Sequence, residues 1–275
     1  MVKHVKAIVF TGFGTNCETE MAQACRLGGA DQVDIVHISE LLDGEYSLDD
    51  YHFLNLPGGF LDGDDLGAAQ AGAHRFNHSI VKTSGEPFRD QITRFIEAGK
   101  LILGVCNGFQ LLVKMGLLPG FDRQYDKRLV SLTYNDSSRF EDRWITLRVE
   151  TGSPCVFTRG LTDLYYPVRH GEGKFVTRDQ ETLDRLEDSR LVALRYTDPR
   201  SDNRPSMEYP FNPNGSLAAI AGICDPGGRI FGLMPHPEAF LYRTNHPRWT
   251  REQMDEEGQG VALFRNGINF IREEL

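Results

Sequence analysis

The sequence predicts an α/β protein whose central sheet is mostly parallel, is covered by helices on both faces, and carries extra antiparallel strands. Short apolar segments alternate with segments of helical periodicity between residues 5 and 115, an order typical of parallel α/β folds. Several of these apolar segments are continuous rather than alternating with polar residues, as expected for parallel strands that are buried on both faces.

The first half of the chain contains the clearest elements. Strands are predicted at 5–11, 33–38, 53–56 and 101–105. A helix is predicted over 18–27, with Thr15 and Asn16 offering side-chain oxygens that could cap its free N–H groups. A second helix is predicted because Phe88, Ile92, Phe95 and Ile96 fall on one helical face, and Gly99 is expected to end it.

The second half has a different pattern. The ranges 129–134, 144–149 and 191–196 are predicted as further strands on the same sheet, some antiparallel, because few long helices separate them. The range 197–215 is rich in Pro, Asn and Asp and is predicted to be a long loop. Apolar residues at 261, 264, 268 and 271 predict a closing helix. We predict a single domain over 1–275.

Composition excludes several classes of protein. The net charge of −9, with 39 acidic and 30 basic residues, argues against nucleic-acid binding, which needs a basic surface. Five irregularly spaced cysteines without a C-x-x-C pair favour neither disulfides nor a metal site. No apolar run of about 18 residues occurs and no signal peptide is recognisable, so we expect a cytoplasmic protein.

The strongest local signal is the segment GVCNGFQ at 104–110, which lies between a predicted strand and a helix-like run. A nucleophile between two glycines at such a turn is typical of a nucleophile elbow, in which flanking side chains would collide with neighbouring backbone. The turn places Cys106 at a helix N-terminus, where the dipole favours a thiolate. The alternative is a buried structural cysteine.

A thiol nucleophile needs a base that is usually distant in sequence. His236 follows the apolar run 230–234 and lies between two prolines that stiffen its turn. Glu238 can then orient the imidazole and stabilise its protonated form. Taken alone, this Pro-His-Pro-Glu segment could equally be a rigid surface turn.

Acyl transfer also requires donors for the developing oxyanion. The Pro-Gly-Gly segment at 57–59 follows a predicted strand, so we predict an oxyanion hole formed by the N–H groups of Gly59 and Asn107. Gly58 is a less favoured donor that could contact substrate. Gln110, one helical turn after the cysteine, is a candidate substrate-binding residue or a solvent-facing one.

These motifs together resemble the class I, triad-type glutamine amidotransferases, which have a flavodoxin-like fold. Finer motifs are similar to the glutaminase subunits of phosphoribosylformylglycinamidine synthases. They are GxGTNCETE at 12–20, CNGFQ at 106–110, NDSSRFEDRW at 135–144, VRHGEGKF at 168–175, NPNGS at 212–216 and PHPE at 235–238. One departure is LDGDDLG at 61–67, where that family usually carries an aromatic-Gly-Asp sequence.

The resemblance implies a glutaminase in which Cys106, His236 and Glu238 release ammonia from glutamine through a γ-glutamyl thioester. Ammonia would pass to a larger synthetase partner in purine biosynthesis, with ATP and Mg on that partner and no cofactor or metal in this subunit. No phosphate-binding loop is present. The resemblance also implies insertions near 61–87 and 197–211, and low activity without the partner.

Alternatives remain at this point. They are a class I amidotransferase subunit for a different acceptor, a non-catalytic glutaminase-like regulatory subunit, and an α/β hydrolase or chaperone with the same elbow. His170, in the HGEG sequence, is a weaker candidate for a site residue and is better explained as a hydrogen-bonded loop histidine. The sequence leaves open the oligomeric state and the need for a small third subunit.

Overall fold

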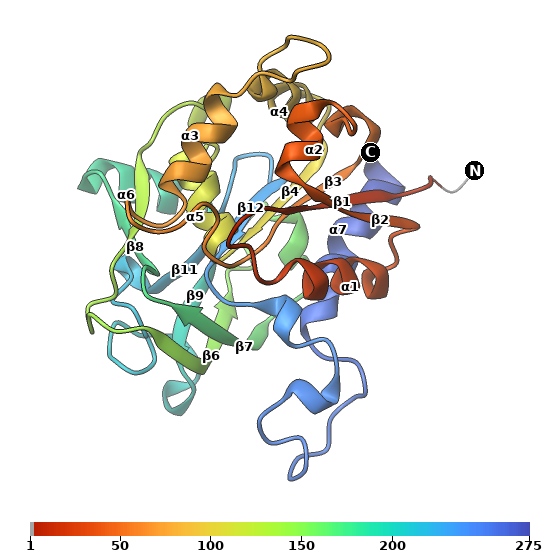
Figure 1. Cartoon of the computed structure of the whole chain (residues 1–275). Coiled ribbons are helices and arrows are strands. Elements are labelled where there is room, and N and C mark those ends of the chain that lie inside the picture. The colour runs from red at the N-terminus through yellow and green to blue at the C-terminus, as the bar shows by residue number, and fades with distance from the viewer. Residues whose placement is uncertain (1–2) are drawn as a thin grey trace.

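The computed structural model describes residues 3–275 and is built on a ten-stranded sheet (Figure 1). Its strands are β1 (Lys6–Thr11), β2 (Gln32–His37), β3 (Phe53–Leu56), β4 (Leu101–Val105), β6 (Glu141–Val149), β7 (Asp163–His170), β9 (Val192–Asp198), β10 (Arg204–Pro205), β11 (Ile220–Cys224) and β12 (Ile230–Leu233). The order is β2-β1-β3-β4-β12-β11-β9-β6-β7, with β10 beside β9.

The sheet changes character at β12. From β2 to β12 every neighbouring pair is parallel. Beyond β12 the pairs through β11, β9, β6 and β7 are antiparallel. The predicted fold class is therefore confirmed, with a parallel half that is extended by an antiparallel half.

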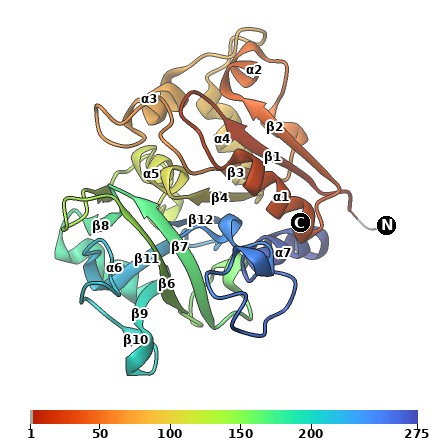
Figure 2. The same ribbon diagram turned by 60° about the horizontal axis from the view of Figure 1, so that its bottom comes forward.

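Helices cover the parallel strands on both sides (Figure 2). They are α1 (Glu18–Gly28), α2 (Ile38–Asp43), α3 (Gln70–His78), α4 (Phe88–Glu97), α5 (Asn107–Lys114) and α7 (Gly260–Glu274). Helix α6 (Gln180–Asp188) instead packs on β8 (Lys174–Thr177). Helices α1 and α7 pack on each other, whereas α3 contacts α4 and α5. Within residues 3–275, no helix is both long and apolar enough to span a bilayer.

Two aromatic clusters fix these layers. Phe10 of β1 packs against Phe76 of α3 and Phe88 of α4 at centroid distances of 5.4 and 6.3 Å. On the α7 side, Phe53 of β3 lies 6.5 Å from Phe264. Such tilted ring pairs add about 0.5–1.5 kcal/mol beyond the area they bury, so each cluster anchors its helices to the sheet.

Most predicted elements of the first half are confirmed. β3 and β4 have the predicted bounds, and β1, β2, α1 and α4 agree within one or two residues. The predicted cap of α1 is wrong, because the N-cap is Cys17 and it forms no side-chain cap hydrogen bond. Asn16 instead donates its backbone N–H to the Gly58 carbonyl at 3.1 Å, since this segment forms a bridge with the 58–60 turn.

Two predictions for the second half are wrong. The range 129–134 contains β5 (Val130–Thr133), which leaves the main sheet and pairs only with β8 (Lys174–Thr177). The range 197–215 is not all loop, because β9 continues to Asp198 and β10 pairs back onto it. The Asp198 carboxylate accepts the Arg200 N–H at 2.8 Å, so polar residues here close a tight hairpin.

The parallel register aligns three chain segments at one edge of the sheet. Leu56 of β3 is paired with Gly104 of β4, and Gly104 is paired with Gly232 of β12. Because parallel strands end on the same edge, the residues that follow these positions come together there. The 57–59 turn, Cys106 and His236 are therefore brought to one place by strand pairing alone.

Candidate active site

Cys106 lies on a strained turn between β4 and α5. Its φ and ψ angles are 52° and −106°, a conformation that non-glycine residues rarely adopt. A Cβ on Gly104 would lie 2.6 Å from the Gly108 carbonyl oxygen, and one on Gly108 would lie 1.9 Å from the Leu56 carbonyl oxygen. The predicted steric reason for both flanking glycines is thus confirmed.

His236 reaches this turn from the neighbouring strand. The Cys106 N–H donates to the Leu233 carbonyl at 2.8 Å, which joins the elbow to the end of β12. Three residues later, the His236 N–H donates to the Pro167 carbonyl of β7 at 2.8 Å. Backbone hydrogen bonds therefore hold the position of His236 independently of the contacts that its side chain makes.

Glu238, in the short helix η6 (Pro237–Ala239), contacts the imidazole of His236. His236 Nδ1 lies 2.6 Å from Glu238 Oε1, and both residues are 2% exposed. Burial opposes the charged form of His236, but the Glu238 carboxylate and the Cys106 sulfur raise its pKa well above the usual value. The pair can therefore hold a proton in a site from which water is largely excluded.

Cys106 and His236 converge on Gly58. A Cβ on Gly58 would lie 2.8 Å from His236 Cε1 and 3.5 Å from Cys106 Cβ, so both residues border the space that this glycine leaves open. Cys106 Sγ also lies 3.5 Å from the Arg169 carbonyl oxygen, to which the thiol can donate. The structure thus brings the predicted thiol, imidazole and carboxylate together.

The Gly-Gly turn lies against the elbow. Gly59 has a φ of 131°, and a Cβ there would lie 2.6 Å from the Gly14 carbonyl oxygen. The Asn107 side chain accepts the Leu61 N–H at 3.0 Å and so ties the turn to α5. Within residues 3–275, no backbone carbonyl accepts the N–H of Gly59 or that of Asn107, which leaves both available as donors.

Gln110 lies inside a buried polar network. Its Oε1 accepts from Asn107 Nδ2 at 2.9 Å, and its Nε2 donates to the Glu172 carbonyl at 2.6 Å. The Glu172 carboxylate in turn accepts the Ala68 N–H at 3.2 Å. At 3% exposure Gln110 does not face solvent. Its amide instead connects the elbow with the 171–173 loop.

His170 ends β7 and is buried at 2% exposure. Its Nδ1 lies 3.1 Å from Asn135 Oδ1, and its Nε2 lies 3.4 Å from Asn214 Nδ2. Burial, with a smaller contribution from the charge of His236, lowers its pKa to about 3. His170 is therefore a neutral imidazole held between two asparagine side chains, and its role is to support the loop beside the site.

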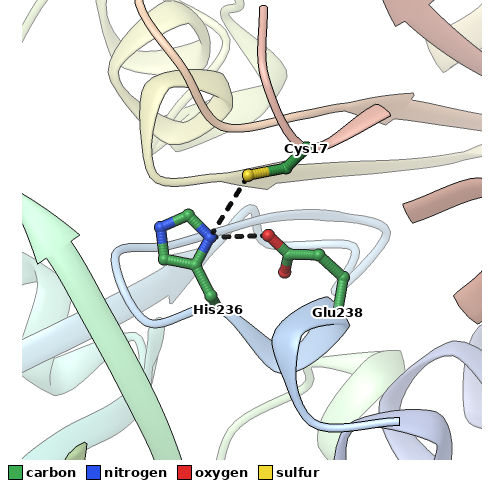
Figure 3. Close-up of side chains that lie close together, drawn as sticks. All are labelled: Cys17, His236 and Glu238. Atoms are coloured by element: carbon green, nitrogen blue, oxygen red, sulfur yellow. Dashed lines mark hydrogen bonds and ion pairs between the residues drawn. The ribbon is translucent and has the colours of Figure 1, made fainter. Parts of the chain in front are cut away.

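Sequence reasoning missed Cys17. Its Sγ lies 4.0 Å from His236 Nδ1, on the same side of the ring as Glu238 (Figure 3). Burial raises the pKa of the Cys17 thiol, although the nearby His236 opposes this effect. The residue follows the carboxyl end of β1, so its position at the active edge could have been inferred from the predicted parallel sheet.

Comparisons with known proteins agree on one family. Residues 4–271 match the model of the CobB/CobQ-like glutamine amidotransferase domain. The chain is 44% identical to phosphoribosylformylglycinamidine synthase subunit PurQ of Dehalococcoides mccartyi over 269 residues, covering 98% of each chain. It is 42% identical to the subunit of the same name from Methanococcus maripaludis strain S2 over 285 residues, covering 99% and 100%.

The chain is also similar in fold to proteins of known structure. A chain in the structure of PurLQS from Thermotoga maritima matches with a TM-score of 0.69 and 28% identity, covering 98% of this chain and 99% of the other. A glutamine amidotransferase from the same organism matches with a TM-score of 0.53 at 16% identity, covering 99% and 100%, and shares the fold alone.

Proposed function

We propose that this chain, which belongs to the CobB/CobQ-like glutamine amidotransferase family, is the glutaminase subunit of a phosphoribosylformylglycinamidine synthase in purine biosynthesis. The observation that carries the proposal is the meeting of Cys106, His236 and Glu238 at one sheet edge, in a chain that matches such subunits over nearly its full length. We propose a cytoplasmic location on the same basis.

In the first half of the reaction, the Cys106 thiolate attacks the side-chain carbonyl carbon of glutamine. The N–H groups of Gly59 and Asn107 stabilise the oxyanion that forms, a contribution of about 3–4 kcal/mol per donor in comparable sites. His236 then protonates the amide nitrogen, the carbon–nitrogen bond breaks and releases ammonia, and a γ-glutamyl thioester remains on the sulfur.

In the second half, His236 accepts a proton from water as the water oxygen attacks the thioester carbon. Collapse of the tetrahedral intermediate breaks the carbon–sulfur bond, releases glutamate and restores the thiolate. Glu238 stabilises the imidazolium in both halves without itself taking the proton. The raised pKa of His236 supports this role, because the imidazolium is the form that must persist beside the thiolate.

The sequence names Gly58 and Gln110 as candidate substrate-binding residues, and we propose a substrate contact for Gly58. Gly58 borders the space between the thiol and the imidazole, where a glutamine side chain would have to enter. Gln110 already uses its amide oxygen and one N–H within the protein. We therefore propose that it acts mainly by positioning Asn107 at the oxyanion hole.

Ammonia then passes to the larger synthetase subunit, where ATP and Mg²⁺ activate the acceptor. A similar chain occurs in PurLQS from Thermotoga maritima, so we propose a second, smaller partner as well. We further propose that the isolated chain turns glutamine over slowly. Full turnover without any partner would refute this last point.

The decisive experiment replaces Cys106 with serine and measures synthesis by the reconstituted complex with glutamine or with ammonia as nitrogen source. We expect glutamine-driven synthesis to disappear and ammonia-driven synthesis to continue. Cys155→Ala, which removes a buried thiol outside the site, should support both reactions. Retention of glutamine-driven synthesis by the folded Cys106→Ser variant would refute the proposed function.

A further inference from the structure

The site contains a second sulfur that the proposed reaction does not use. Cys17 is the N-cap of α1, whereas His236 and Glu238 follow β12 near the other end of the chain. One ligand atom from each of the three residues, including Cys17 Sγ, lies within 4.8 Å of the other two (Figure 3). A thiol, an imidazole and a carboxylate at such distances match the donor set that zinc prefers.

We propose that Cys17, His236 and Glu238 form an inhibitory binding site for a borderline-soft divalent cation such as Zn²⁺. The site takes the cation through Cys17 Sγ, His236 Nδ1 and one Glu238 oxygen. Its inhibitory effect rests on the proposed glutaminase function, whereas binding itself does not.

The present distances require little movement. Around a tetrahedral Zn²⁺ with bonds of about 2.3 Å to sulfur and about 2.0 Å to nitrogen, these two atoms lie roughly 3.5 Å apart. Cys17 Sγ and His236 Nδ1 are 4.0 Å apart. His236 Nδ1 and Glu238 Oε1 are 2.6 Å apart and would separate by less than about 1 Å. The fourth position is left for water.

Charge and burial also favour a cation here. A Cys17 thiolate and the Glu238 carboxylate would together neutralise a divalent ion, which removes the cost of burying a net charge. Glu238 Oε2 is buried without a hydrogen-bond partner within residues 3–275. Burial raises the pKa of the Cys17 thiol, so binding must release its proton together with the one between His236 and Glu238.

The donor set separates zinc from magnesium. Mg²⁺ prefers six oxygen ligands in octahedral geometry, and a site with sulfur and nitrogen offers it little. The Mg²⁺ that ATP requires on a synthetase partner would therefore not occupy this site. Zn²⁺ bound to Nδ1 would break the contact between His236 and Glu238 and stop glutamine hydrolysis, while ammonia-driven synthesis would continue.

The test measures metal binding on the full chain and inhibition on the complex. Binding of Zn²⁺ and of Co²⁺ is followed by calorimetry and by the thiolate-to-cobalt charge-transfer band. We expect Cys17→Ser to weaken Zn²⁺ binding at least about tenfold, because even the loss of a group that only orients a ligand typically costs about 10–100-fold. Cys106→Ser should still bind Zn²⁺ and show the cobalt band, because Cys106 is not a ligand.

If Cys17→Ser does not fold, measurements that keep Cys17 in place test the same proposal. X-ray absorption at the zinc edge should show one sulfur at about 2.3 Å with nitrogen and oxygen neighbours at about 2.0 Å, and zinc should protect Cys17 from alkylation in the Cys106→Ser variant. In the complex, Zn²⁺ but not added Mg²⁺ should inhibit the glutamine-driven reaction.

Three results would overturn the proposal. They are unchanged zinc binding by Cys17→Ser, loss of binding in Cys106→Ser, and a zinc shell without sulfur. Failure of the proposed function gives a different pattern, since zinc would then bind through Cys17 in a protein that hydrolyses no glutamine.

Discussion

Replacing Glu238 with glutamine tests the electrostatic part of the mechanism. The substitution keeps the size of the side chain but removes the negative charge that lies 2.6 Å from His236 Nδ1. Two unit charges about 4 Å apart interact by about 4 kcal/mol at an effective dielectric constant near 20. Because 1.36 kcal/mol corresponds to a tenfold change in rate, we expect glutamine hydrolysis to fall about 10³-fold.

The direction of this effect follows from the burial of His236. Burial disfavours the imidazolium, and the Glu238 carboxylate is the largest influence that compensates for it. Without the carboxylate, the pKa of His236 should fall and the proton needed by departing ammonia should be held less well. The glutamine amide can also donate to Nδ1 and so stabilise the unproductive tautomer.

The assay compares glutamine-driven with ammonia-driven synthesis in the reconstituted complex. Glu257→Gln is the matched control, because Glu257 pairs with Arg265 at 2.6 Å on the surface, with side chains 46% and 40% exposed. Such surface pairs contribute little, so we expect less than about a twofold change. A loss below tenfold for Glu238→Gln, or an equal loss with ammonia, would refute the reasoning.

Two further predictions concern packing and pH. Gly108→Ala should abolish glutaminase activity and destabilise the protein by several kcal/mol, because its Cβ would lie 1.9 Å from the Leu56 carbonyl oxygen. Gly85→Ala is the control, because a Cβ there would have no atom within 4 Å. In urea unfolding it should lower the stability by only about 1 kcal/mol, through backbone strain. His170 has a pKa of about 3 in the folded chain and near 6.5 in the unfolded chain. Between these two pH values the unfolded chain binds one proton more than the folded chain, so the free energy of unfolding should fall as the pH drops below 6.5. The slope from this residue is about 1.4 kcal/mol per pH unit, and a His170→Gln variant that kept the wild-type slope in urea titrations between pH 6.5 and 4 would contradict this account.

Much of the parallel half could be predicted from the sequence because local and global signals agree there. β3 and β4 are short, mainly apolar segments bounded by turn residues, and the structure has the predicted bounds without change. The Gly-x-Cys-x-Gly segment at 104–108 also indicates the geometry of the turn, since only glycine fits the positions on either side of it. The strand–glycine–cysteine–glycine order is therefore visible in the sequence, although the atom that a Cβ on Gly108 would meet is the Leu56 carbonyl oxygen of another strand.

The antiparallel half could not be predicted as well, because its strands are placed by contacts between distant segments. β5 has the composition of a sheet strand, and nothing in its residues reveals that β8 rather than the main sheet is its partner. Cys17 follows β1, so its place at this edge of the sheet could be inferred from the sequence, but its contact with His236 could not. Its importance lies in the 4.0 Å approach to His236, which depends on how β1 and β12 are placed in the sheet.

The position of β12 has a consequence for synthesis of the protein. β12 pairs directly with β4, although Cys106 and His236 are separated by 236 − 106 = 130 residues. At translation rates of roughly 5–20 residues per second, the histidine emerges on the order of ten seconds after the cysteine. A growing chain therefore carries its sulfur without this base throughout that interval, and the catalytic site cannot be complete before β12 has been synthesised.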